Sequence, residues 1–545
     1  MFCKKWVFGI IATLLLVFGF KAVDNFFELS KNIEIFGAVY KTVNSDYVDE
    51  PKPGELMKVG IDAMLASLDP YTNFYSESEA VDAMIMRSGE YGGVGCQSVK
   101  RGDYIYITSV FKGLAADKAG LRVGDKVTEI NGKSFFTRSM DEYSNAIKGT
   151  PNSRVNLTVE RDGKPISLEI SREEIKIKNI AYFGLINSET GYIRLEHFLQ
   201  GAGAEVKEAL ISLKAKGAKQ VVLDLRDNGG GLLNEAVNIV NVFVDGGQLV
   251  TYSKGRTKEA NRNYLTLDPA TDTKIPLVVL INNRSASASE IVSGAIQDLD
   301  RGVVLGVNSF GKGLVQNVKA LVYRTQMKVT IAKYYIPSGR CIQELDYGKK
   351  GKDGKATILP DSLRKKFKTK NGRIVLDGGG VKPDIIEEAV KLSKTAQLLE
   401  KNYLVFDYAT LYRNKNESIG NLNAFIISDK DFEDFVNFVK LEDFKEKSDV
   451  EKQLIALKQA AEKDNSFAPI SNDVQSIQLK LKEQFIKDVL TQKIELKRLI
   501  SNEIIRRYYY EESLFLNSFT QDNNILKALE IFSSPINYQS ILTVK

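Results

Sequence analysis

A chain of 545 residues exceeds what one hydrophobic core usually serves, so we expect several domains. The apolar fraction of 43% is that of a globular protein, and 75 basic and 69 acidic residues leave a net charge of only +6. The sequence contains no basic stretch interleaved with aromatic residues, so it does not favour a nucleic-acid-binding function. The three cysteines, Cys3, Cys96 and Cys341, are too few for a disulfide framework and lack metal-ligand spacing. We therefore expect no cofactor and no metal.

The first 23 residues resemble an export or anchoring segment. Lys4 and Lys5 precede the apolar run WVFGIIATLLLVFGF, which Lys21 closes. The run is shorter than the roughly 20 residues of a spanning helix, and no small-residue cleavage site follows, so an uncleaved anchor and an unusual signal peptide both stay open. Either one would export the remainder and leave the two lysines inside. In a bacterial cell envelope, such a segment would place the protein in the periplasm, anchored to the inner membrane by residues 1–23.

Residues 24–90 are predicted to form an N-terminal helical region. Apolar residues recur there at helical spacing, in Phe36, Val39 and Val43 and again in Met57, Ile61, Met64 and Leu68. The turn residues DPYT at 69–72 end the second stretch, because proline disfavours helix in the residue before it.

Residues 91–175 predict a compact module of short strands and two short helices. A glycine-rich turn opens it at 91–95, and hairpin turns follow at Asn131-Gly132 and Asp162-Gly163. The stretch AGLRVGDKVTEINGK makes the module resemble a PDZ domain. That resemblance implies that Gly93, Val94 and Gly95 cradle the terminal carboxylate of a peptide, which adds as a strand to a sheet edge. Taken alone, the glycine loop fits a simple tight turn equally well.

Residues 176–389 alternate between strand and helix patterns. Short apolar runs at 221–225, 277–281 and 303–307 are typical of strands buried on both faces, and turns or helix starts follow the first two. This order predicts an α/β core with largely parallel strands and functional groups at their carboxyl ends.

Residues 390–545 are predicted to form a charged helical extension. Glycine becomes scarce, and long amphipathic patterns cover 431–461 and 473–516. No chemical motif stands out, so we expect a helical part that packs on the core or mediates homo-oligomerisation.

Three alternating serines mark the chemical site. Ser285, Ser287 and Ser289 lie where a strand ends and a helix begins, and we interpret two of them as helix N-caps. A serine nucleophile needs a base, yet the chain has a single histidine, His197. Lys312, between two glycines after the third apolar run, can replace it if burial lowers its pKa to roughly 7–8. This pattern predicts a Ser-Lys hydrolase.

Several motifs make the chain similar to the carboxy-terminal processing peptidases, the tail-specific serine proteases. They are SASASEI, FGKGLVQ, DLRDNGGG, TIAKYYIPSGRCIQ, GGVKPDI and LDPYTNFY, and the resemblance covers about residues 35–389. It implies a mixed α/β multidomain fold, with a protease core of the ClpP/crotonase-like type and an inserted PDZ module.

The same resemblance implies the roles of the site residues. Ser287 would be the nucleophile, Lys312 the general base and Gln316 the side chain that orients the lysine. Backbone N–H groups of Ala288 and of Gly229 or Gly230 would form the oxyanion hole. His197 lies away from these motifs.

The expected function is a serine endopeptidase that captures free protein C-termini on the PDZ module and cleaves through an acyl-enzyme. Its partners would be protein or peptide substrates and the membrane, with no nucleic acid. Two alternatives stay open: a non-catalytic PDZ scaffold on an inactive hydrolase core, and an esterase or amidase that ignores the PDZ module.

Overall fold

The computed structural model describes residues 26–544 except 78, 81–88, 352–355, 359, 390, 421–424, 443, 445, 511, 512, 514, 517 and 518. The chain divides into two compact units. The first contains the residues up to Ala80 together with Gln316–Thr330, and the second contains the remainder. The apolar segment predicted as an anchor lies outside the described residues. Among the described helices, none has the length and apolarity needed to cross a membrane.

The first unit is built from helices and the end of a hairpin. A helix covers residues 26–46, and α2 (Pro53–Ala66) follows it, in agreement with the helical periodicity. A short strand, β1 (Asn73–Tyr75), then pairs antiparallel with the start of β18 (Gln326–Tyr335), whose hairpin partner is β17 (Leu314–Ala320).

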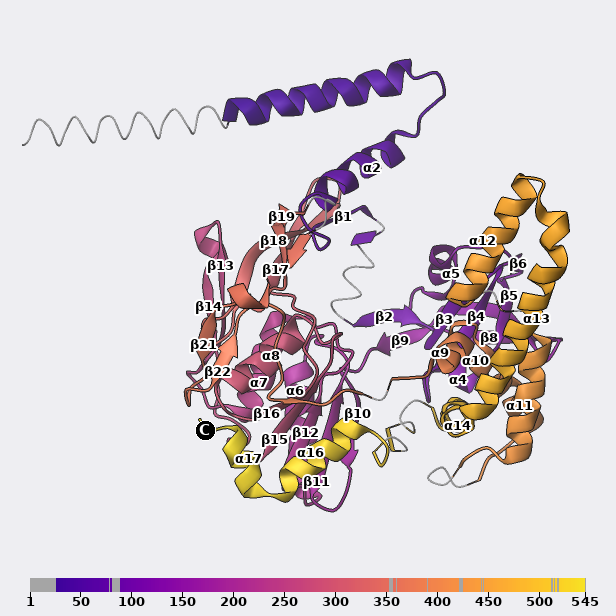
Figure 1. Ribbon diagram of the computed structural model, residues 1–545. Helices are drawn as coiled ribbons and strands as arrows, with labels where there is room; N and C mark the ends of the chain where they lie inside the picture. Colours follow the sequence, from indigo (N-terminus) through magenta and orange to yellow (C-terminus); the bar gives the residue numbers. More distant parts are fainter. Residues whose placement is uncertain are drawn as a thin grey trace, which may run out of the picture. The chain divides into compact units, whose positions relative to one another are not determined.

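The second unit contains a six-stranded sheet at the centre of its α/β core (Figure 1). Its strands, in spatial order, are β10 (Ile180–Leu185), β11 (Thr190–Leu195), β12 (Gln220–Asp224), β15 (Leu277–Ile281), β16 (Val303–Gly306) and β23 (Ile385–Ile386). All neighbouring pairs are parallel except β10 with β11. The prediction of a mixed α/β fold with largely parallel strands is confirmed.

Helices cover both faces of this sheet because its strands are apolar on both sides. Val221 and Leu223 face the cluster that includes α6 (Ala202–Ala215), α7 (Leu233–Phe243) and α8 (Ala288–Asp298). Val222, between them, faces the opposite cluster, as the two-residue period of a strand requires. That second cluster is completed by α16 (Asn523–Ser533) and α17 (Pro535–Ile541), drawn in yellow in Figure 1.

Smaller strands extend the core. The later part of β18 pairs with β13 (Leu249–Gly255), and β13 pairs with β14 (Arg262–Leu265). Two small hairpins follow, β19 (Leu345–Lys350) with β20 (Ala356–Ile358) and β21 (Lys366–Lys368) with β22 (Ile374–Leu376).

The PDZ-like module has its own apolar core. Its sheet runs in the order β3 (Cys96–Arg101), β4 (Tyr104–Val110), β5 (Lys126–Ile130), β7 (Arg154–Arg161) and β8 (Lys164–Ser171), with β6 (Lys133–Ser134) beside β5. Two helices, α4 (Ala115–Lys118) and α5 (Met140–Ile147), complete it. The strands β2 (Glu90–Gly93) and β9 (Glu173–Lys176), which precede and follow this sheet in sequence, pair with each other as a two-stranded antiparallel ribbon. Within the described residues β3 is therefore an edge strand.

The helical extension divides into two parts. A bundle with its own core runs from α9 to α14, and the last two helices pack instead on the central six-stranded sheet. The bundle helices are α9 (Lys394–Lys401), α10 (Leu404–Lys415), α11 (Asp429–Leu441), α12 (Asp449–Lys463), α13 (Phe467–Thr491) and α14 (Lys493–Tyr509).

Candidate active site

Ser287 occupies a strained turn at the carboxyl end of the central sheet. Strand β15 ends at Ile281, and α8 begins directly after Ser287. The backbone of Ser287 has φ 56° and ψ −113°. This positive-φ conformation costs a residue with a side chain on the order of 1–3 kcal/mol, and such strain clusters at functional sites. The turn leaves Ser287 half-buried between the buried residues Ala286 and Ala288.

The two flanking serines hold this turn in place. The Ser285 hydroxyl donates to the carbonyl of Leu225 at 2.8 Å, and the Ser289 hydroxyl donates to the carbonyl of Asn228 at 2.9 Å. The prediction that two of the serines are helix N-caps is wrong for this pair. Both side chains are buried, and both hydroxyl groups donate to the turn that follows β12. They therefore connect the carboxyl ends of the neighbouring strands β12 and β15.

Gly230 lets that neighbouring turn lie directly against Ser287. Its φ is 95°, and a Cβ atom there would lie 2.6 Å from the carbonyl oxygen of Ala286 and 2.9 Å from the Cβ of Ser287. No residue with a side chain fits this position without displacing the Ser287 backbone.

The backbone donors around Ser287 are not equivalent. The N–H of Gly230 donates to Oδ1 of Asn228 at 2.9 Å. The N–H groups of Gly229 and Ala288 donate to no other residue within the described part of the chain. The position where a Cβ of Gly229 would stand is open space. These two N–H groups therefore remain the donors available to a ligand.

A cluster of buried ion pairs holds the end of β12 and the turn that follows it. Asp224, at the end of β12, accepts from the hydroxyl of Tyr192 at 2.7 Å and from the guanidinium groups of Arg194 at 2.9 Å and Arg226 at 2.6 Å. Burial opposes ionisation, but the two guanidinium groups hold the pKa of Asp224 well below its usual range. Arg226 also pairs with Asp522 at 2.8 Å, just before α16. The last helices are thus linked to the active-site turn.

Glu290 joins the Ser287 turn to the loop that carries Lys312. Its carboxylate accepts from the N–H of Ser287 at 2.8 Å, the N–H of Lys312 at 2.9 Å, the N–H of Gly311 at 2.7 Å and the hydroxyl of Ser309 at 2.6 Å. Glu290 is fully buried, and burial raises its pKa to about 7 despite these four donors.

Tyr334 makes a second link between the same two residues. Its buried hydroxyl lies 2.6 Å from the carbonyl oxygen of Lys312 and 3.1 Å from that of Ser287. The structure therefore brings the predicted nucleophile and the predicted base together through two shared partners, Glu290 and Tyr334. The Lys312 residue itself is half-buried between two buried glycines.

Sequence analysis missed both of these linking residues. Glu290 could have been found, because a glutamate three residues after a serine at a helix start is the pattern of a capping box. Tyr334 lies on β18 within the motif TIAKYYIPSGRCIQ, but nothing in that motif indicates that its hydroxyl reaches the carbonyl groups of Ser287 and Lys312.

Gln316 and His197 are the other two side chains that the sequence analysis considered. Gln316 belongs to the first unit, where its Nε2 donates to Oγ1 of Thr330 at 3.2 Å. The Thr330 N–H donates in turn to the hydroxyl of Thr72 at 3.2 Å, and that hydroxyl donates to Asp69 at 3.0 Å. His197 is exposed after β11, and nothing in its surroundings suggests a catalytic role.

The predicted carboxylate cradle lies at the start of β3. Gly93 ends β2, and Val94 is buried with its carbonyl accepting from Ala116 at 2.7 Å. Gly95 has φ 85°, and its carbonyl accepts from the N–H of Phe111 at 3.0 Å. With both carbonyls engaged inside the module, the loop has a fixed backbone.

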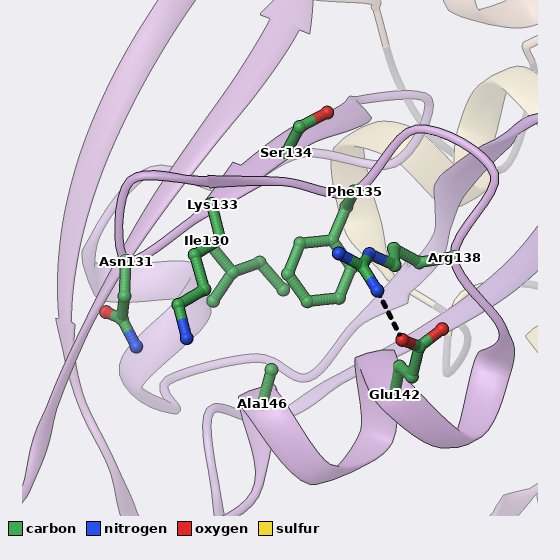
Figure 2. Close-up of a pocket in the computed structure, with 8 residues that line it drawn as sticks. All are labelled: Ile130, Asn131, Lys133, Ser134, Phe135, Arg138, Glu142 and Ala146. Atoms are coloured by element: carbon green, nitrogen blue, oxygen red, sulfur yellow. Dashed lines mark hydrogen bonds and ion pairs between the residues drawn. The ribbon is translucent and has the colours of Figure 1, made fainter.

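A pocket of about 330 Å³ on this module is separate from the cradle. Figure 2 shows it between the β5–β6 hairpin and α5, with Arg138 and Glu142 forming an ion pair of 2.7 Å at its rim. None of the three cradle residues lines it.

Comparisons with known proteins agree with this architecture. The model of peptidase family S41 matches residues 189–349, a PDZ domain matches 106–161, and a family described as "Probable PDZ-protease, C-terminal helical domain" matches 395–532. A Carboxy-terminal-processing protease of Bartonella bacilliformis is 34% identical over 319 residues, which are 57% of this chain and 73% of that protein. The chain belongs to the carboxy-terminal processing proteases of family S41.

Two further relatives show how far the similarity extends. A Probable CtpA-like serine protease of Staphylococcus aureus (strain bovine RF122 / ET3-1) is 36% identical over 314 residues, 57% of this chain. The match spans 62% of the length of that relative. Among solved structures, a photosystem II D1 C-terminal processing protease is 25% identical, with a TM-score of 0.36, over 65% of this chain and 92% of that one.

Proposed function

We propose that this protein is a serine endopeptidase that cleaves other proteins near their C-termini, with Ser287 as nucleophile and Lys312 as general base. The observation that carries the proposal is the pairing of Ser287, on a strained turn, with the Lys312 loop through Glu290 and Tyr334. Membership of the processing-protease family supports the same reaction class.

In the proposed reaction, the neutral amine of Lys312 removes the proton from the Ser287 hydroxyl as its oxygen attacks the substrate carbonyl. The lysine ammonium then gives that proton to the leaving amine, and an acyl-enzyme remains on Ser287. A water molecule, deprotonated by the same amine, releases the acyl group and restores the serine. Gln316 would orient the lysine, as the family resemblance implies.

The developing oxyanion would be stabilised by backbone N–H groups. Ala288 opens α8, so its N–H belongs to the free donors of a helix start. Of the two predicted glycines we favour Gly229, because the N–H of Gly230 is engaged by Asn228. Gly230 would act through its missing side chain, which allows the turn to approach Ser287.

Substrate capture would occur on the PDZ module. The fixed loop at Gly93, Val94 and Gly95 would bind the terminal carboxylate, and the tail would pair with the free edge of β3. Export through the N-terminal segment stays a prediction.

The test is cleavage of a folded protein that carries a disordered, apolar C-terminal tail. We expect the wild-type chain to release defined C-terminal fragments, and Ser287→Ala and Lys312→Ala each to lower the rate at least a thousandfold while leaving the circular dichroism spectrum unchanged. Arg154→Ala, in an exposed ion pair on β7, is the control and should cleave normally. Cleavage at the wild-type rate by either active-site variant would reject the assignment.

A further inference from the structure

The helical bundle packs on the PDZ module at a defined surface. The guanidinium of Arg101, the last residue of β3, makes two hydrogen bonds of 2.6 Å with the carboxylate of Asp407 on α10. The same guanidinium lies 4.3 Å from the ring centre of Tyr403 and 5.7 Å from that of Phe406. Both rings belong to the bundle, so β3 ends against α10 and the residue that precedes it (Figure 1).

Two further contacts fix this docking. The hydroxyl of Tyr510 donates to Asp117 on α4 at 2.7 Å. Gly124, in the turn before β5, lies so close to Thr410 that an added Cβ would stand 2.3 Å from its methyl group. The bundle therefore meets the module at three separated points rather than at one flexible contact.

The side chains of β3 alternate between two faces. On one face, Cys96 lies 3.9 Å from the hydroxyl of Tyr143 on α5, and Lys100 donates to the carbonyl of Thr137, just before α5, at 3.1 Å. On the other face, Arg101 lies 4.7 Å from the ring centre of Tyr106 and contacts the bundle. Even positions of β3 thus face α5, and odd positions face the side on which the bundle docks.

A tail bound to the edge of β3 must share this alternation. Its carboxylate would lie at Gly93–Gly95, at the start of β3, so the tail would run antiparallel to the strand, from Arg101 towards Cys96. The terminal residue and every second residue before it would face α5. The second, fourth and sixth residues from the end would face the other side, and the sixth would lie near Arg101.

We propose that the helical bundle forms a second wall of the tail-binding site, in which Tyr403, Phe406 and Tyr106 receive an apolar or aromatic side chain at the sixth position from the substrate C-terminus. The inference rests on the proposed tail capture by the PDZ module. The charge of Arg101 is already paired with Asp407, and its side chain is 18% exposed. The guanidinium lies over all three rings, and that of Arg507 also lies 4.6 Å from the ring centre of Phe406. The surface therefore offers the ring parts that these cations leave uncovered rather than a free charge, and all three residues are partly exposed.

The test measures binding of labelled ten-residue peptides to the full chain in a Ser287→Ala background, by fluorescence anisotropy. One peptide has leucine at the sixth position from its free C-terminus, and another has serine there. We expect the leucine peptide to bind about fivefold more tightly to the parent chain, as partial burial of one apolar side chain predicts. A leucine-to-serine change at the fifth position, which would lie on the α5 side, serves as the register control and should respond differently to the variant below.

Tyr403→Asn removes the ring without straining the backbone. Tyr403 has φ 59°, a conformation that asparagine adopts readily. In this variant the preference for leucine over serine at the sixth position should vanish, while the effect of the fifth position persists. Tyr323→Asn, the same substitution at another tyrosine of positive φ, in the β17–β18 turn, should leave both peptides unchanged.

The outcomes separate this inference from the proposed function. An unchanged leucine preference in Tyr403→Asn would overturn the second wall while tail capture stands. If a peptide with an amidated C-terminus binds as tightly as the free acid, carboxylate capture itself fails, and the register argument fails with it.

Discussion

Glu290 illustrates how one buried side chain can organise the proposed catalytic pair. Its two oxygens accept from donors on both sides of the site, the Ser287 turn and the Lys312 loop. Three of the donors are backbone N–H groups, which cannot reverse direction. An ionised carboxylate satisfies all four donors, whereas a protonated one gives up an acceptor position. The geometry of the site therefore depends on the charge of a group whose pKa is near 7.

The first prediction concerns pH. As pH falls through about 7, Glu290 gains a proton and the link between the two loops weakens, so activity should fall with it. In Glu290→Gln the amide N–H₂ faces either the N–H of Gly311 or the N–H groups of Ser287 and Lys312, so at least one fixed donor loses its acceptor. The kcat should therefore fall at least tenfold, and the part of the pH dependence that Glu290 causes should disappear. Identical pH–activity profiles of the wild type and Glu290→Gln would contradict this role.

The stability of the folded protein should change with pH in the direction opposite to that of the activity. The folded pKa of Glu290 lies above the ordinary value of 4.5, so its contribution to stability is fully present below about pH 4.5 and is lost as pH rises through about 7. The full effect is on the order of 3 kcal/mol. The Tm of the wild type minus that of Glu290→Gln should therefore decrease between pH 5 and pH 7.5. A constant difference across this range would show that Glu290 keeps one protonation state throughout.

Gly230 gives a second prediction at the scale of residues. In Gly230→Ala the added Cβ must displace Ser287, so we expect a loss of at least tenfold in kcat in a folded protein. Gly163→Ala is the matched control, because Gly163 also has positive φ, 70°, but faces open space. It should cost about 1–2 kcal/mol in stability and leave kcat unchanged. Equal activity losses in both variants would point to general destabilisation instead.

At the scale of elements, sequence pattern and structure agree best where the periodicity is strong. The short apolar runs at 221–225, 277–281 and 303–307 correspond to β12, β15 and β16, because strands covered on both faces need apolar residues at every position. The roles of Ser285 and Ser289 were misjudged. N-cap preference is a local rule, whereas their hydrogen bonds run to a turn about 60 residues earlier in the chain.

The prediction treated residues 390–545 as one helical part and did not separate the last two helices, which pack on the protease core, from the bundle before them. They carry few charges, Lys527 and Glu530 in α16 and none in α17, and they cover one face of the central sheet. The hydroxyl of Tyr538 on α17 both accepts from the N–H of Leu277 at 3.0 Å and lies 3.2 Å from its carbonyl. No sequence periodicity specifies which surface an amphipathic helix will cover.

A prediction follows for α16. Ile525 is fully buried against the sheet, so Ile525→Ala should destabilise the protein by about 2–5 kcal/mol in denaturant unfolding. Leu526→Ala, one residue along on the 44% exposed side, should change stability by less than about 0.5 kcal/mol. Equal effects of the two substitutions would show that α16 does not cover the sheet in solution.

At the scale of the whole molecule, the chain combines a protease core, a PDZ module and a helical bundle whose contacts with the module are specific. The family resemblance pointed to Ser287 and Lys312 because their motifs are short and local. It gave no role to the bundle, since the docking of Arg101 on Asp407 joins residues 306 positions apart, and no single-sequence pattern reports such a pair.

The central claim is that Ser287, activated by Lys312, forms an acyl-enzyme. The most direct measurement is intact-mass spectrometry after rapid quenching of the enzyme with an activated ester of a tail peptide, followed by fragmentation of the tryptic peptide 285–301. We predict an adduct of the acyl mass on Ser287, absent in Ser287→Ala and formed at least a thousandfold more slowly in Lys312→Ala. An adduct on another residue, or one that forms at the wild-type rate without Lys312, would contradict the account.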